Sequence, residues 1–104
     1  MYYVKTVDIT MDTILRKSEN IVFRKIEDEF ILVTIRSNAA DLDYIYTLNE
    51  VGARIWELID GIRTVSDIRD IICSEYDVTP ETAASDLDTL FAELISLSTI
   101  TPTA

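Results

Sequence analysis

The sequence contains no histidine and only one cysteine, two glycines and two prolines in 104 residues. The missing histidine removes the usual general base at neutral pH, and with it the Ser/His and Cys/His nucleophilic pairs. Because Cys73 is the only cysteine, one chain cannot form an internal disulfide or a Cys/His zinc site. The scarcity of glycine and proline argues against a disordered chain. We therefore expect an ordered protein that is not an enzyme and that holds no metal or other cofactor.

Acidic residues dominate the charged residues of the sequence. Nineteen Asp and Glu outnumber nine Lys and Arg, which gives a formal net charge of −10, and no cation follows Arg69. Such a surface repels a phosphate backbone, so we do not expect nucleic acid as a partner. The first residues lack the basic-then-apolar plan of a signal peptide, and no apolar run is long enough to span a bilayer. Composition thus predicts a cytoplasmic protein with no membrane partner.

Three β-rich runs precede the middle of the chain, at residues 21–26, 30–35 and 44–48. A short polar break at 27–29 separates the first two, and a loop from 37 to 43 separates the second from the third. Hydrophobic residues make up 48% of the sequence, which is enough for the core of one domain. The pattern predicts a three-stranded antiparallel meander whose central strand is the almost wholly apolar run 30–35.

The third strand of this meander is predicted to be an edge, with unpaired backbone N–H and C=O groups. Its alternation places Tyr44, Tyr46 and Leu48 on one face and Ile45 and Thr47 on the other. The pattern does not decide which of these two faces meets the core.

A first helix is predicted over residues 50–59, directly after the third strand. Asn49 is a suitable N-cap, and Gly61 is a suitable left-handed residue beyond the helix end. Gly52 lies in the first turn, where a glycine suggests that another backbone passes close by. Trp56 lies on the apolar stripe of this helix, so we expect it to anchor the core.

Two further helices complete the pattern. Thr64 and Asp67 predict a capping box at the start of the second helix. Thr79 followed by Pro80 predicts the start of a third, which ends near Leu97. Residues 99–104 are expected to form a tail that Pro102 keeps out of the helix.

The order of elements predicts an α+β, winged-helix-like fold, in which a three-stranded antiparallel sheet is followed by three helices (βββααα). This domain covers residues 20–104. Residues 1–19 show no clear period, and they are an N-terminal arm, an extra strand or a segment exchanged between subunits. Of these alternatives, a loosely packed arm is favoured.

Two stretches in the middle of the chain form a recognisable pattern, LNEVGARIWELIDGIRTVSDI from Leu48 and EYDVTPETAASDLDTLFAEL from Glu75. Their order is L-N-x-x-G-x-x-I-W-x-L-x-D-G, then a capped helix, then E-Y-D-V and a helix with inward-facing leucines. In this pattern the chain resembles the PqqD family. The resemblance covers about residues 21–97. It departs from the family at 98–100, where Ser-Thr-Ile replaces a closing Gly-Leu pair.

The resemblance implies a recognition element for precursor peptides that are made on the ribosome. Proteins of this family bind the leader part of such a precursor and present it to a modifying enzyme such as a radical-SAM protein, without doing chemistry themselves. The peptide is implied to add as a strand to the third strand, beside the third helix. On this basis the predicted peptide-binding residues are Asp43, Tyr44, Ile45, Tyr46, Thr47, Thr82, Asp86, Thr89 and Glu93. Their acidic members would favour a leader that carries Lys or Arg, or would reject acidic ones.

Two other functions remain alternatives at this point. In the first alternative, the chain is a non-catalytic dimerisation or regulatory module that has no leader peptide. Its third strand would then pair with that of a second copy in a homodimer. A small enzyme that relies on carboxylates is the other alternative, which no motif supports.

Overall fold

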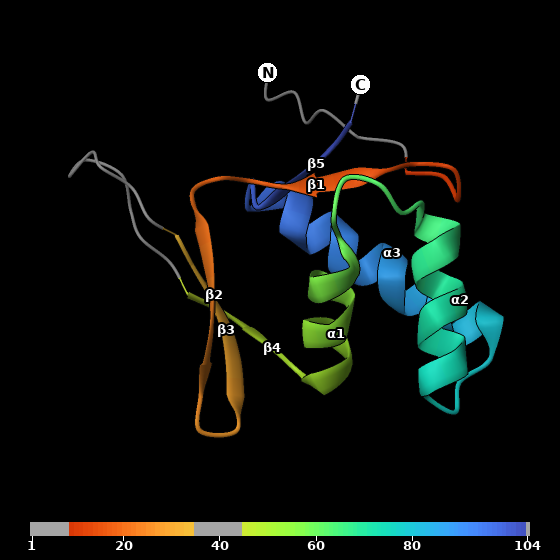
Figure 1. Cartoon of the computed structure of the whole chain (residues 1–104), viewed down its shortest axis with the longest axis horizontal. Coiled ribbons are helices and arrows are strands. Elements are labelled where there is room, and N and C mark those ends of the chain that lie inside the picture. The colour runs from red at the N-terminus through yellow and green to blue at the C-terminus, as the bar shows by residue number, and fades with distance from the viewer. Residues whose placement is uncertain (1–8, 35–44, 104) are drawn as a thin grey trace, which may run out of the picture.

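The computed structural model describes residues 9–34 and 45–103 (Figure 1). Within these ranges the elements, in chain order, are β1 (Leu15–Lys17), β2 (Ile21–Ile26), β3 (Glu29–Thr34), β4 (Ile45–Leu48), α1 (Glu50–Leu58), α2 (Val65–Glu75), α3 (Pro80–Ser96) and β5 (Ile100–Pro102). The predicted α+β class is confirmed, because an antiparallel sheet of three strands precedes three helices. The predicted loop at 37–43 lies outside the described residues.

The three-stranded sheet has the order β2-β3-β4, so β3 is its central strand as predicted. Phe23 of β2 pairs with Leu32 of β3, which in turn pairs with Tyr46 of β4. Leu32 is buried, so this row lies on the side of the sheet that meets the helices. In the part of the chain that the structure describes, β4 pairs only with β3. Its other edge is therefore unpaired there, as the sequence predicts.

A second, two-stranded sheet joins the two ends of the described chain. β1 pairs with β5 in antiparallel register, with Leu15 opposite Pro102. Leu15 and Ile100 are only 1% and 0% exposed, and Figure 1 shows this sheet lying across one end of the helices. Leu15–Lys17 is an extra strand, the alternative to the favoured loosely packed arm, and part of the expected tail is a strand at Ile100–Pro102. Both segments are held because each places an apolar side chain in the core.

The helices begin where their capping residues predict. The Asn49 side chain accepts a hydrogen bond from the first turn of α1, and Thr64 and Asp67 form the predicted capping box of α2. Thr79 caps α3, with Pro80 as its first residue. No helix in the described ranges is both long and apolar enough to cross a membrane. Local side-chain chemistry thus fixes the entry of each helix.

The two glycines have different roles. Gly61 has a φ of +78°, so it is the left-handed residue that the sequence predicts after α1. Gly52 is buried, and a Cβ atom there would lie 3.1 Å from Asn49 Oδ1 and 3.4 Å from Leu48 Cδ2. The nearest atoms of the chain are thus side-chain atoms and not the second backbone that the sequence suggests. Glycine leaves room for the cap that starts its own helix and for the side chain of Leu48.

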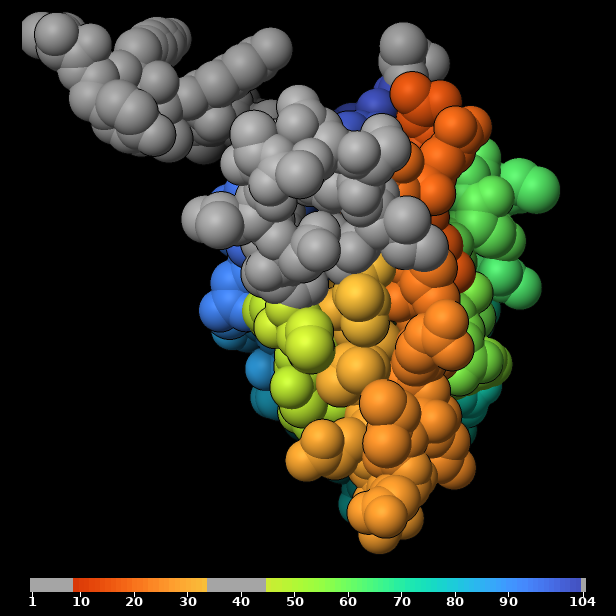
Figure 2. Space-filling view, turned by 90° about the vertical axis from the view of Figure 1, so that its left-hand side faces the viewer, coloured from red at the N-terminus to blue at the C-terminus, as the bar shows by residue number. Residues whose placement is uncertain are grey.

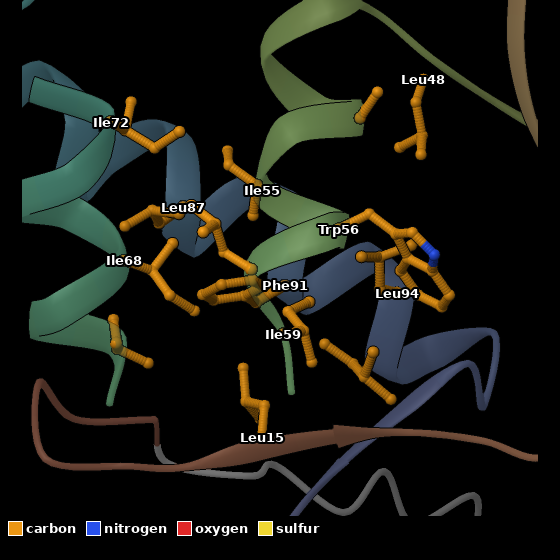
Figure 3. Close-up of a cluster of buried hydrophobic side chains, with 14 of the residues drawn as sticks. Leu15, Leu48, Ile55, Trp56, Ile59, Ile68, Ile72, Leu87, Phe91 and Leu94 are labelled. Carbon is orange, nitrogen blue, oxygen red and sulfur yellow. The ribbon is translucent and has the colours of Figure 1, made fainter. Parts of the chain in front are cut away.

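The core lies between α1, α2, α3 and the two-stranded sheet (Figure 3). Trp56 is 3% exposed and points toward Leu94, which confirms it as a core anchor. Phe91 of α3 is fully buried near the centre, and Leu15 closes the core from β1. The Lys17 ammonium group lies 4.9 Å from the centre of the Trp56 ring. This packing fixes α3 relative to α1 and so to the strand that leads into α1.

Candidate functional site

A groove of about 370 Å³ lies beside the unpaired edge of the three-stranded sheet. Figure 2 shows β4 at the margin of the sheet, with atoms of α3 next to it. The groove is formed by β4, α1, α2, α3 and the connection between α2 and α3. Its lining residues are Tyr46, Thr47, Leu48, Asn49, Val51, Gly52, Ile55, Ile72, Val78, Ala83, Asp86, Thr89, Leu90 and Glu93.

The floor of the groove is apolar. Leu48, Ile55, Ile72 and Ala83 are all buried, and each comes from a different element. Leu90 of α3 is partly buried and packs against the same cluster. An apolar side chain entering the groove would therefore contact the edge of the core directly, which favours its transfer from water.

One wall of the groove is a polar stripe on α3. Asp86, Thr89, Leu90 and Glu93 lie on the same side of the helix because they are spaced at i, i+3, i+4 and i+7. The Thr89 hydroxyl donates to the Ser85 carbonyl at 3.1 Å. The stripe thus offers two carboxylates to the groove, with a leucine between them.

Tyr46 connects the strand to this wall. Its hydroxyl donates a hydrogen bond to a Glu93 carboxylate oxygen, so β4 and α3 are joined across one part of the groove. Burial raises the pKa of Tyr46 to about 12, and the hydrogen bond to Glu93 adds to the effect. At neutral pH the phenol is therefore protonated and donates its hydrogen bond. The contact holds the Glu93 side chain in place on the groove wall.

Among the described residues, no cation neutralises the negative charge of the groove, because none of its lining residues there is a Lys or Arg. The arginines in the helical half have acidic partners elsewhere. Arg54 donates to both oxygens of Glu75 at 2.7 Å, and Arg63 pairs with Asp60 at 2.6 Å. Asp86 is exposed and, among the residues that the structure describes, has no hydrogen-bond or ion-pair partner. The groove is therefore a site of negative potential above an apolar floor.

The groove brings together five of the predicted peptide-binding residues, namely Tyr46, Thr47, Asp86, Thr89 and Glu93. Thr82 is not among the lining residues, and its hydroxyl accepts a hydrogen bond from that of Thr79. Ile45 is 66% exposed and lies on the opposite face of the sheet from Tyr46. Asp43 and Tyr44 lie outside the described residues. A role in binding stays a prediction for all of these residues.

Sequence reasoning missed the floor of the groove. Leu48, Ile55, Ile72 and Ala83 have the spacing and the apolar character of core residues, and sequence patterns assign them to the core. The same side chains form the floor because the groove opens onto this edge of the core. The signal that could have found them is the position of α1 directly after an unpaired strand.

The fold and the groove together define a class of small α+β domain in which a groove with an apolar floor lies beside the edge strand of the sheet. The family model described as Coenzyme PQQ synthesis protein D (PqqD) matches residues 29–100, which is more than half of the chain. The chain therefore belongs to the PqqD family. No curated protein sequence matches it at a significant level.

A solved structure resembles the chain in both fold and sequence. It is described as TbiB1 in complex with the TbiA(beta) leader peptide, and its sequence is 28% identical. The TM-score is 0.69, and the match covers 86% of this chain and 98% of that chain. The shared architecture thus extends beyond the residues that the family model matches.

Proposed function

We propose that this protein is a peptide-binding adaptor that captures the leader segment of a ribosomally synthesised precursor peptide. The observation that carries the proposal is the unpaired edge of β4 beside the groove. An extended peptide that adds to such an edge gains backbone hydrogen bonds, and alternate side chains enter the neighbouring groove. Membership of the PqqD family supports the proposal, and so does the likeness to TbiB1, which was solved with a leader peptide bound.

In this proposal the protein presents the peptide to a modifying enzyme, such as a radical-SAM protein, and does no chemistry itself. The sequence has no histidine, and the groove offers carboxylates, threonines and apolar side chains. These groups suit binding better than nucleophilic catalysis, which commonly pairs a Ser or Cys nucleophile with a histidine. Ribosomally synthesised precursor peptides are made in the cytoplasm, so we place the adaptor there as well.

The proposal is tested by filling the groove. Thr89 is exposed and lines the groove, so Thr89→Trp should place an indole where the peptide side chains enter. Ala92 is an exposed residue of the same helix that does not line the groove, so Ala92→Trp is the matched control. Neither change removes a core side chain, and circular dichroism should show the same helix content in both variants.

Binding is measured by fluorescence anisotropy with a labelled leader segment of the precursor encoded beside this chain's gene. We expect Thr89→Trp to weaken binding at least tenfold and Ala92→Trp to leave it within twofold. Amide chemical-shift changes should centre on Ile45–Leu48 and α3. Equal affinities for the two variants would refute the proposed site. A dimer that persists with and without peptide in light scattering would favour pairing of β4 with a second copy instead.

A further inference from the structure

We propose that the peptide segment held in this groove carries an apolar residue with a Lys or Arg two positions away on at least one side. In its full form the pattern is basic–x–apolar–x–basic. The inference rests on the proposed function and specifies the chemistry of the peptide. It follows from the order of side chains along the groove wall, where Leu90 lies between Asp86 and Glu93.

The spacing of the wall suits an extended chain. Asp86 and Glu93 are seven residues apart on α3, which corresponds to about 10.5 Å along the helix axis. In a strand, residues i−2 and i+2 point to the same side and are about 13 Å apart. The flexible stems of Lys and Arg can absorb the difference of roughly 3 Å. The apolar residue at position i then lies over Leu90 and the groove floor.

Charge favours a cationic partner for this wall. Within the described part of the chain, the Asp86 carboxylate has no partner, and the Glu93 carboxylate accepts a hydrogen bond only from the neutral Tyr46 hydroxyl. A carboxylate can accept further bonds at its remaining lone pairs, so Glu93 can hold Tyr46 and a peptide cation together. Since none of the described residues that line the groove is a Lys or Arg, its two carboxylates would disfavour an acidic peptide there.

A metal ion suits these two carboxylates less well. Among the described residues no group of three or more Asp, Glu, His or Cys side chains could hold one, and two helix turns separate Asp86 from Glu93. Two separate cationic side chains on one extended segment satisfy both carboxylates without bringing them together. The apolar floor adds a requirement that a metal ion or a polyamine cannot meet.

The test uses a peptide library, so that the sequence of the bound peptide need not be known beforehand. A display library of random twelve-residue peptides is selected against the wild-type protein and against the double variant Asp86→Asn, Glu93→Gln. Glutamine at position 93 keeps an oxygen that can accept from Tyr46, so the wall should keep its shape. Asp88→Asn is the matched control, because Asp88 is an exposed acid on the same helix that does not line the groove.

We expect wild-type selections to be enriched in Lys or Arg two positions from an apolar residue. The enrichment should persist with Asp88→Asn and disappear with the double variant. For one enriched peptide, each groove substitution should weaken binding about two- to fivefold, as for exposed ion pairs. Replacing the peptide cation by Gln should remove that sensitivity. Raising the salt concentration should weaken wild-type binding more than binding to the double variant.

The outcomes separate the two proposals. In one outcome, the selected peptides fail to bind Thr89→Trp, which places them in the groove, and yet show no preference for Lys or Arg. This result would overturn the present inference and leave the adaptor function standing. Selected peptides that bind Thr89→Trp and Ala92→Trp equally well would overturn both. A selection that enriches no peptide would also count against both. Basic enrichment that survives in the double variant would show that Asp86 and Glu93 do not set the preference.

Discussion

The burial of Leu15 makes a sharp prediction, because the sequence pattern favours a loosely packed arm at this position. Leu15 is 1% exposed and belongs to the main core cluster. Leu15→Ala removes three carbon atoms, which costs roughly 2.4 kcal/mol at about 0.8 kcal/mol for each buried methylene. The cavity left behind adds to this cost, so we expect a total loss of about 2–5 kcal/mol in the free energy of unfolding.

The assay is urea unfolding followed by circular dichroism, with a thermal scan beside it. A loss of 3 kcal/mol should lower the melting temperature by more than about 10 °C in a domain of this size. Two controls bracket the result. Leu15→Met keeps the volume and should cost less than about 1.5 kcal/mol. Arg16→Ala changes the exposed neighbour on the same strand and should stay within about 0.5 kcal/mol. If Leu15→Ala unfolds within about 0.5 kcal/mol of wild type, β1 does not belong to the core.

Three further predictions concern single groups. The raised pKa of Tyr46 means that the folded protein holds the phenol proton tightly, so this stabilisation is present below about pH 10 and is lost as the pH rises toward 12; ultraviolet titration should show a late-titrating tyrosine that Tyr46→Phe removes. Arg54 lowers the pKa of Glu75 below its usual 4.5, so its stabilisation is present above that pH and is lost as the pH falls through the lowered value; Glu75→Gln should flatten this part of the stability profile. Gly61→Ala should cost about 1 kcal/mol in urea unfolding because its φ of +78° disfavours a side chain, and an unchanged midpoint would contradict this.

The features that the sequence predicts well are those with a local cause. Asn49, Thr64 and Thr79 each cap a helix through atoms within three residues, so the helix starts follow from short motifs. The three-stranded meander is similar, because its strands follow one another in the chain and pair in order. The edge strand directly before α1 follows from the meander, whereas a groove beside α3 was implied only by the resemblance to the PqqD family.

What the sequence could not predict depends on contacts between distant segments. β1 and β5 are three residues each, and their pairing joins Leu15 to Pro102, for which no local pattern exists. The face of β4 is a second example. Alternation groups Tyr46 with Leu48, but only the packing of the helices decides that Leu48 is buried and Ile45 is 66% exposed.

The pairing of β1 with β5 also bears on how the chain matures during synthesis. A strand near residue 15 must wait for residues 100–102 before it has a partner, because a ribosome adds residues in order at about 5–20 each second. For several seconds of synthesis β5 is therefore missing from the end of the core where Leu15 and Ile100 meet. Closing so long a loop comes late, since distant contacts must first overcome the entropy of the chain between them. We therefore expect a chain released before Ile100 to expose apolar surface at that end and to be the form that chaperones and proteases recognise.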